Sequence, residues 1–83
     1  MDKYVAVVCT YSFETTVDVY LFSTIQEGRK FLKEWILSEY QNDLDCGFDS
    51  EYHIDDDEEY GRIKVYFPSY TDVTEAKLGL VHD

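Results

Sequence analysis

The 83-residue sequence predicts an α+β fold in which a single helix packs on an antiparallel sheet, in the order β-β-α-β-β-β. Two patterns lead to this prediction. One segment repeats apolar residues at helical spacing, while the segments on both sides of it alternate, or run apolar, over the length of a strand. The apolar fraction of 45% is high enough for a folded core, and the length allows one domain spanning residues 1–83.

The first two strands are expected to form a hairpin. Residues 4–10 are β-branched and apolar, which is typical of a strand buried on both faces or nearly so. Residues 12–15 form a polar break, and residues 17–22 then alternate with a period of two. Because the connection is short, antiparallel pairing of the two strands is favoured.

A helix is predicted to follow the hairpin. Ser23 with Gln26, or Thr24 with Glu27, supplies a capping-box signature at its start. The helix is expected to end near residues 41–42, with a loop over residues 43–47, because Asn and Asp favour caps and turns. Its apolar face comprises Ile25, Gly28, Phe31, Leu32, Trp35, Ile36 and Tyr40, and its charged residues Arg29, Lys30, Lys33 and Glu34 lie away from that face.

Three more strands are predicted after the helix. Residues 48–55 and 62–67 alternate, and a hairpin between them would place Glu51 and His53 opposite Lys64 and Arg62. The five acids at 55–59 cannot be buried and are expected to form an exposed turn. Pro68 ends the fourth strand. Residues 75–81 read as a fifth strand, either paired within the sheet or offered as an edge to another chain.

The formal net charge of −11 is concentrated in one segment. Residues 39–59 contain ten acids and neither Lys nor Arg, whereas the other 62 residues hold eight acids and seven bases. The chain is therefore a nearly neutral domain with one intensely acidic segment. Its acids are Glu39, Asp43, Asp45, Asp49, Glu51, Asp55, Asp56, Asp57, Glu58 and Glu59.

The composition and motifs argue against several classes of function. Direct binding of nucleic acid or of an anionic membrane needs a basic surface, which this chain lacks. The acidic segment fails the EF-hand pattern, and Cys9, Cys46, His53 and His82 lack zinc-site spacing. No catalytic motif is present, so we expect no enzyme activity, no cofactor and no metal. No signal-peptide pattern precedes the first strand, which predicts a cytoplasmic protein.

The acidic segment suggests a protein partner with a basic groove. Alternate residues of a strand lie about 6.6 Å apart, so Asp49, Glu51 and Asp55 would present a short row of carboxylates that imitates DNA phosphates. Tyrosines in this half of the chain offer contact area at low entropy cost. The predicted partner-binding residues are the ten acids together with Tyr52 and Tyr60.

In size, charge and aromatic content the chain resembles the small acidic proteins with which phages and mobile elements inhibit bacterial defence nucleases, the DNA-mimicking anti-CRISPR and anti-restriction proteins. The resemblance covers overall character and no motif. It implies a basic nucleic-acid-binding partner, such as a CRISPR or restriction nuclease in the cytoplasm of a bacterial cell.

A second interpretation stays open. The acidity would then serve only solubility, and the protein would be a general interaction or accessory module resembling an antitoxin. Its contacts would run through an apolar and aromatic surface comprising Tyr11, Phe13, Tyr20 and Phe22.

Overall fold

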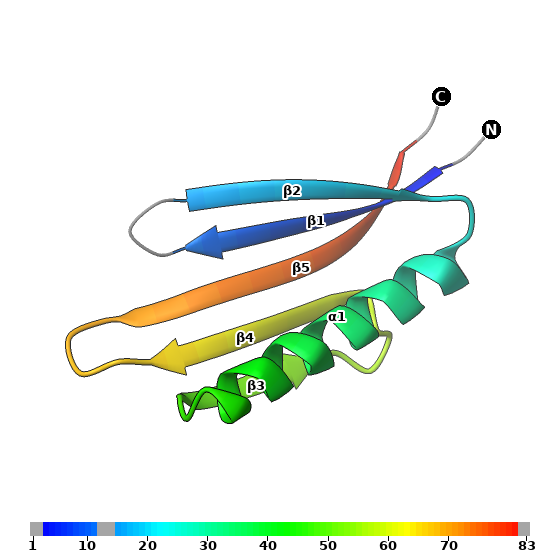
Figure 1. The fold of residues 1–83 in the computed structure, drawn as a ribbon. Coiled ribbons are helices and arrows are strands. Elements are labelled where there is room, and N and C mark those ends of the chain that lie inside the picture. The colour runs from blue at the N-terminus through cyan, green and yellow to red at the C-terminus, as the bar shows by residue number, and fades with distance from the viewer. Residues whose placement is uncertain (1–2, 12–14, 82–83) are drawn as a thin grey trace.

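The computed structural model describes residues 3–11 and 15–81, and it confirms the predicted α+β fold (Figure 1). Phe13 and His82, which entered the sequence predictions, and most of the polar break lie outside the described residues. The elements are β1 (Lys3–Tyr11), β2 (Thr15–Phe22), α1 (Ile25–Asp45), β3 (Asp49–Ile54), β4 (Tyr60–Tyr66) and β5 (Thr71–Val81).

The five strands form one antiparallel sheet in the order β2-β1-β5-β4-β3. The two predicted hairpins, β1–β2 and β3–β4, are both present. Strand β5 lies between them and pairs with β1 on one side and with β4 on the other, so it is not an edge. In the second hairpin, Glu51 lies opposite Lys64 and His53 opposite Arg62, which confirms the predicted register.

The helix begins as predicted but ends later. The hydroxyl of Thr24 accepts a hydrogen bond from the backbone N–H of Glu27 at 3.2 Å, so the second of the two capping options is the one used. The predicted end at residues 41–42 is wrong, because α1 continues to Asp45. It ends where Gly47 adopts a φ of +79°, and the N–H groups of Gly47 and Phe48 donate to the carbonyls of Leu44 and Asp43. These two bonds form a Schellman motif, in which glycine takes the left-handed position.

The strand boundaries also differ from the prediction. Strand β3 covers Asp49–Ile54 rather than 48–55, and β4 runs from Tyr60 to Tyr66 rather than from 62 to 67. Strand β5 begins at Thr71 instead of residue 75, because its polar first residues pair with β4 although they lack an apolar pattern. Strands β1 and β2 are each extended beyond the predicted apolar residues. Pairing in the sheet therefore reaches further than apolar alternation indicates.

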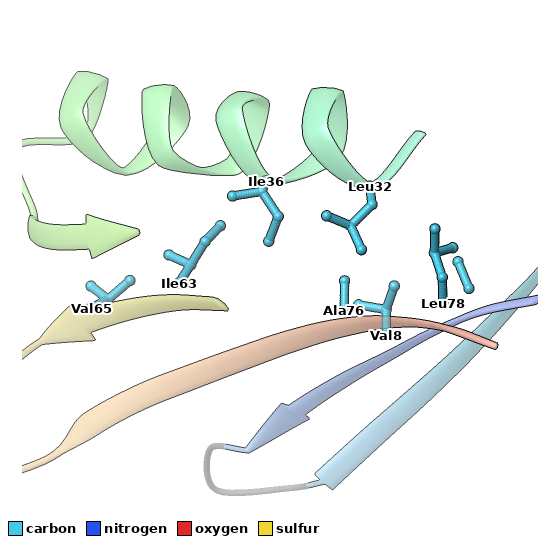
Figure 2. Close-up of a cluster of buried hydrophobic side chains, with 8 residues drawn as sticks. Val8, Leu32, Ile36, Ile63, Val65, Ala76 and Leu78 are labelled. Atoms are coloured by element: carbon cyan, nitrogen blue, oxygen red, sulfur yellow. The ribbon is translucent and has the colours of Figure 1, made fainter. Parts of the chain in front are cut away.

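The core lies between α1 and one face of the sheet (Figure 2). Leu32 and Ile36 project from the helix toward the strands and are fully buried. The remaining buried apolar residues are Ala6, Val8, Ile63, Val65, Ala76 and Leu78. Partly buried members of the predicted helical stripe, such as Phe31 and Trp35, pack against this cluster.

The other face of the sheet, called here the open face, is not covered by α1. The first strand, predicted to be buried on both faces or nearly so, is fully buried only on the face beneath the helix. Ala6 and Val8 are buried beneath the helix, whereas Val5 and Val7, which point to the open face, are only half-buried. A single helix can cover only one side of a sheet, and the apolar run of residues 4–10 does not reveal which side stays uncovered.

Candidate functional site

The ten acids of residues 39–59 lie on three consecutive elements: the second half of α1, strand β3 and the β3–β4 turn. Strand β3 is one edge of the sheet, and α1 runs alongside it (Figure 1). Most of the net charge is thus carried along one side of the molecule. We call the ten acids the acidic edge.

At one end of the acidic edge, carboxylates surround the C-terminus of α1. The last turn of the helix contains no basic residue. Asp43 accepts a hydrogen bond from the Ser50 hydroxyl at 3.2 Å, and Asp45 accepts one from the Gln41 amide at 2.9 Å. A helix C-terminus already carries a partial negative charge, and each further anion there costs about 0.3–1 kcal/mol. The negative potential is therefore high at this end, at some expense to helix stability.

Along β3 the carboxylates are partly compensated. Asp49 and Glu51 share the open face with His53, as the predicted alternation requires, but β4 places Tyr66, Lys64 and Arg62 opposite these three residues. The hydroxyl of Tyr66 donates a hydrogen bond to Glu51 at 2.5 Å. This bond raises the pKa of Tyr66 above its usual value. The strand is therefore not a bare row of carboxylates.

At the other end of the acidic edge, the β3–β4 turn is held by hydrogen bonds between its own residues. The predicted exposed turn is present: Asp56 and Asp57 are exposed, and Asp55, Glu58 and Glu59 are half-buried. The backbone N–H of Glu58 donates to the carbonyl of Asp55, and that of Glu59 donates to the carboxylate of Asp57. Glu58 has a φ of +59°, the left-handed region that few non-glycine residues adopt.

Two carboxylates of the turn are paired with the helix. The Nη2 atom of Arg29 lies 3.6 Å from Oε2 of Glu59, and the Nζ atom of Lys33 lies 3.5 Å from Oε1 of Glu58. Arg29, predicted to lie away from the apolar face of the helix, is half-buried. A third carboxylate, Asp55, lies 2.6 Å from the Nε2 atom of His53, and the two form an ion pair when the imidazole is protonated. These pairs attach the turn to the rest of the fold, so not all of its charge is free.

Among the described residues, the other acids of the edge form no salt bridge. The exposed members of this group are Asp45, Asp49, Glu51, Asp56 and Asp57. Strand β3 separates the carboxylates at α1 from those at the turn. Its six residues span about 20 Å, close to the axial advance of about six nucleotides of one DNA strand.

A groove of about 530 Å³ lies beside the turn, between α1 and the outer edge of β3. Leu37 and Tyr52 contribute apolar surface to it, and Asp55, Asp56 and Glu58 contribute carboxylates. Leu37, which falls outside the apolar stripe of the helix, is 37% exposed in this groove. Its position outside the stripe was evident from the sequence, but Leu37 was not among the predicted partner-binding residues. Its only signal was an apolar side chain out of phase with the helix period.

The two tyrosines predicted to bind a partner differ in their surroundings. Tyr52 is exposed, and its ring packs on Tyr40 with centroids 4.7 Å apart. The hydroxyl of Tyr60 donates to Glu75 at 3.0 Å. Burial raises the pKa of Tyr60 above its usual value, and the bond to Glu75 raises it further. Tyr52 therefore offers a partly exposed aromatic surface beside Tyr40, whereas the hydroxyl of Tyr60 is already bonded within the fold.

We expect Tyr60→Phe to lower the free energy of unfolding by about 1 kcal/mol at pH 7, because the hydrogen bond to Glu75 is lost. The raised pKa means that the fold favours the neutral phenol. Its stabilisation is thus fully present below the ordinary tyrosine pKa of about 10 and is lost as the pH rises through the folded-state value. Urea unfolding at pH 7 and pH 11 should show a smaller loss on alkalinisation for Tyr60→Phe than for the wild type. Equal losses would contradict the prediction. Tyr52→Phe is the matched control.

The aromatic residues named for the alternative interpretation are partly used within the fold. The rings of Tyr20 and Phe22 lie 4.7 Å and 5.1 Å from the ring of Phe31 on the helix. Tyr11 is 46% exposed on the open face. The described part of this set therefore does not form one continuous aromatic surface.

Other features of the described chain concern ligands and membranes. Within residues 3–11 and 15–81, no group of three or more His, Cys, Asp or Glu side chains is arranged to hold a metal ion. No helix in that part of the chain is long and apolar enough to cross a membrane. The chain matches no protein-family model, and it matches no curated protein sequence.

Proposed function

We propose that this protein is a non-enzymatic inhibitor that uses the acidic edge to occupy the DNA-binding groove of a basic, nucleic-acid-binding protein, such as a CRISPR or restriction nuclease in a bacterial cytoplasm. The observation that carries the proposal is the concentration of unpaired carboxylates at the two ends of β3, about 20 Å apart. A groove that holds successive phosphates presents Lys and Arg over such a length.

The acids in the last turn of α1 provide a second, independent argument for the proposal. Asp43 and Asp45 occupy a position where basic residues stabilise a helix and acidic residues weaken it. Sequences that act against a local rule of stability often do so at functional sites. A binding role gives a reason for acids at this position, whereas solubility alone would be served equally well by acids elsewhere on the surface.

The proposal assigns different roles to the acids. Asp45, Asp49 and Asp56 are exposed and form no ion pair, so they are free to meet Lys and Arg of the partner. Glu58 and Glu59 are paired with the helix and chiefly hold the turn in place. The exposed ring of Tyr52 and the side chain of Leu37 provide apolar contact beside the charges.

A charge-matched pair of variants tests this assignment. The first carries Asp45→Asn, Asp49→Asn and Asp56→Asn, which keep side-chain size and one acceptor oxygen at each position. The control carries Asp18→Asn, Glu27→Gln and Glu34→Gln, at exposed positions outside the acidic edge. Both variants change the formal charge from −11 to −8. The immobilised proteins are exposed to bacterial lysate, and the retained proteins are eluted with NaCl or with duplex DNA.

The wild type and the control should retain nucleic-acid-binding proteins that duplex DNA displaces and that rising salt releases. The affinity of the triple variant at the acidic edge for these proteins should be at least about tenfold lower, because each charge-assisted contact contributes about 1.5–3 kcal/mol. Equal retention by the two variants would refute binding through the acidic edge. Retained proteins that duplex DNA does not displace would refute DNA mimicry.

A further inference from the structure

Strand β2 is the opposite edge of the sheet, and it differs sharply from β3. It pairs only with β1, and it forms the upper border of the sheet in Figure 1. Every residue of β2 except Phe22 is exposed. On the open face it carries Val17, Val19 and Leu21, which are 56%, 58% and 65% exposed.

Strand β2 has few of the usual protections of an edge strand, because Asp18 is its one charged residue. Edges are commonly shielded by Lys, by Pro, by a bulge or by shortness, because their unpaired backbone groups otherwise recruit another strand. Strand β2 has eight residues without Lys, Pro or Gly, and its register with β1 is continuous from Thr15 to Phe22. Strand β3 has six residues and carries Asp49, Glu51 and His53 on the open face.

The exposed apolar row of β2 continues onto its neighbour. Val5 lies opposite Leu21 and Val7 opposite Val19 on the open face, and both β1 residues are only half-buried. An apolar strip two strands wide therefore ends at an unpaired backbone edge. Such a combination of backbone hydrogen-bonding groups and apolar side chains fits another β-strand.

We propose that β2 pairs antiparallel with β2 of a second copy of this chain, which joins two sheets into one of ten strands. The distribution of charge identifies a second copy as the occupant. Asp18 is the only charged residue of β2, so two such edges meet with little repulsion. In the joined sheet the two β3 strands would be nine strand spacings apart, about 43 Å, which is several times the screening length of about 8 Å. Both acidic edges would therefore stay remote from each other and accessible.

The sequence of β2 favours a register centred on Val19 over one centred on Asp18. If Val19 lies opposite Val19 of the second copy, Val17 faces Leu21 and Asp18 faces Tyr20 in both halves of the interface. The open-face row then becomes a continuous apolar strip across the two-fold axis. A pairing centred on Asp18 would place two carboxylates directly opposite each other, which is destabilising.

Sedimentation equilibrium over a wide range of concentrations tests the association. The wild type should change reversibly from 9.8 kDa to twice that mass. Val19→Lys should weaken the association at least about tenfold, because it places two ammonium groups opposite each other at the centre of the interface. Leu44→Lys is the control, since it makes the same charge change at an exposed leucine of α1. A wild type that stays monomeric at millimolar concentration would overturn the proposal.

Cross-linking tests the register independently. In a background of Cys9→Ser and Cys46→Ser, Val19→Cys should form a covalent dimer on oxidation, because directly opposed Cβ atoms lie about 4.5–5.5 Å apart. Val17→Cys should not, because its two copies would be about 13 Å apart. A doubled mass that survives Val19→Lys, or equal cross-linking of the two cysteine variants, would overturn pairing through β2. Neither result depends on the proposed function of the acidic edge.

Discussion

Leu32→Ala is expected to lower the free energy of unfolding by about 2–5 kcal/mol, the range observed when a fully buried leucine is truncated. Leu32 has no exposed surface, and it is one of the two largest completely buried side chains of the described chain. It fills the space between α1 and the sheet together with Ile36 (Figure 2). Because small domains are stable by only about 5–15 kcal/mol, this one substitution should remove a large part of the total.

The control for this prediction is Leu37→Ala. It makes the same chemical change in the same helix, so the two variants share their effect on helix propensity. Leu37 is 37% exposed, and we expect its truncation to cost about 1 kcal/mol or less. Urea unfolding of the two variants gives the comparison. Equal losses at the two positions would show that the helix does not pack on the sheet through Leu32.

Gly61→Ala is expected to destabilise the protein by about 1–3 kcal/mol, although alanine adds only one methyl group. Gly61 is buried in β4 directly beneath the helix. A Cβ atom there would lie 2.8 Å from Cγ1 of Ile36 and 3.2 Å from Cδ2 of Leu32. The Cγ1 atom belongs to the middle of a fully buried side chain, so the helix would have to move away from the sheet to make room.

Gly79→Ala provides the matched control for Gly61→Ala, because Gly79 is also a strand glycine, in β5. A Cβ atom at Gly79 would meet its nearest neighbour, Cγ2 of Val5, at an ordinary contact distance of 3.9 Å. We expect this substitution to be neutral or to stabilise the protein by up to about 1 kcal/mol, since alanine restricts the unfolded chain. Thermal unfolding should therefore show a clearly lowered midpoint temperature for Gly61→Ala and an unchanged or raised midpoint temperature for Gly79→Ala. A neutral Gly61→Ala would contradict close approach of helix and strand.

Much of the fold was accessible from local patterns. The helical stripe contains the residues that face the core, and the charge alternation of β3 and β4 specified the pairing of Glu51 with Lys64. The end of α1 was missed because Asn42 and Asp43 were weighted as turn residues. The stronger signal was Gly47, whose left-handed conformation closes the Schellman motif.

The identity of the acidic residues of the candidate site was predictable from the sequence, but the ion pairs that they form were not. Counting charges located all ten acids of the edge. The pairs Arg29–Glu59 and Lys33–Glu58 could not be anticipated, because they join residues about 25 to 30 positions apart that come together only when the helix lies over the sheet. The placement of β5 between the hairpins likewise depends on long-range pairing, and it alone determines that β2 and β3 are the two edges.

The central position of β5 also governs when the sheet can assemble during synthesis. The hairpins β1–β2 and β3–β4 share no strand pairing, and each is joined to the sheet only through residues 71–81. A ribosome adds about 5–20 residues per second, so the last residue of β5 is synthesised about 1–3 seconds after the last residue of β4. The complete sheet, and with it the two-layer core, can therefore form only after β5 has been synthesised.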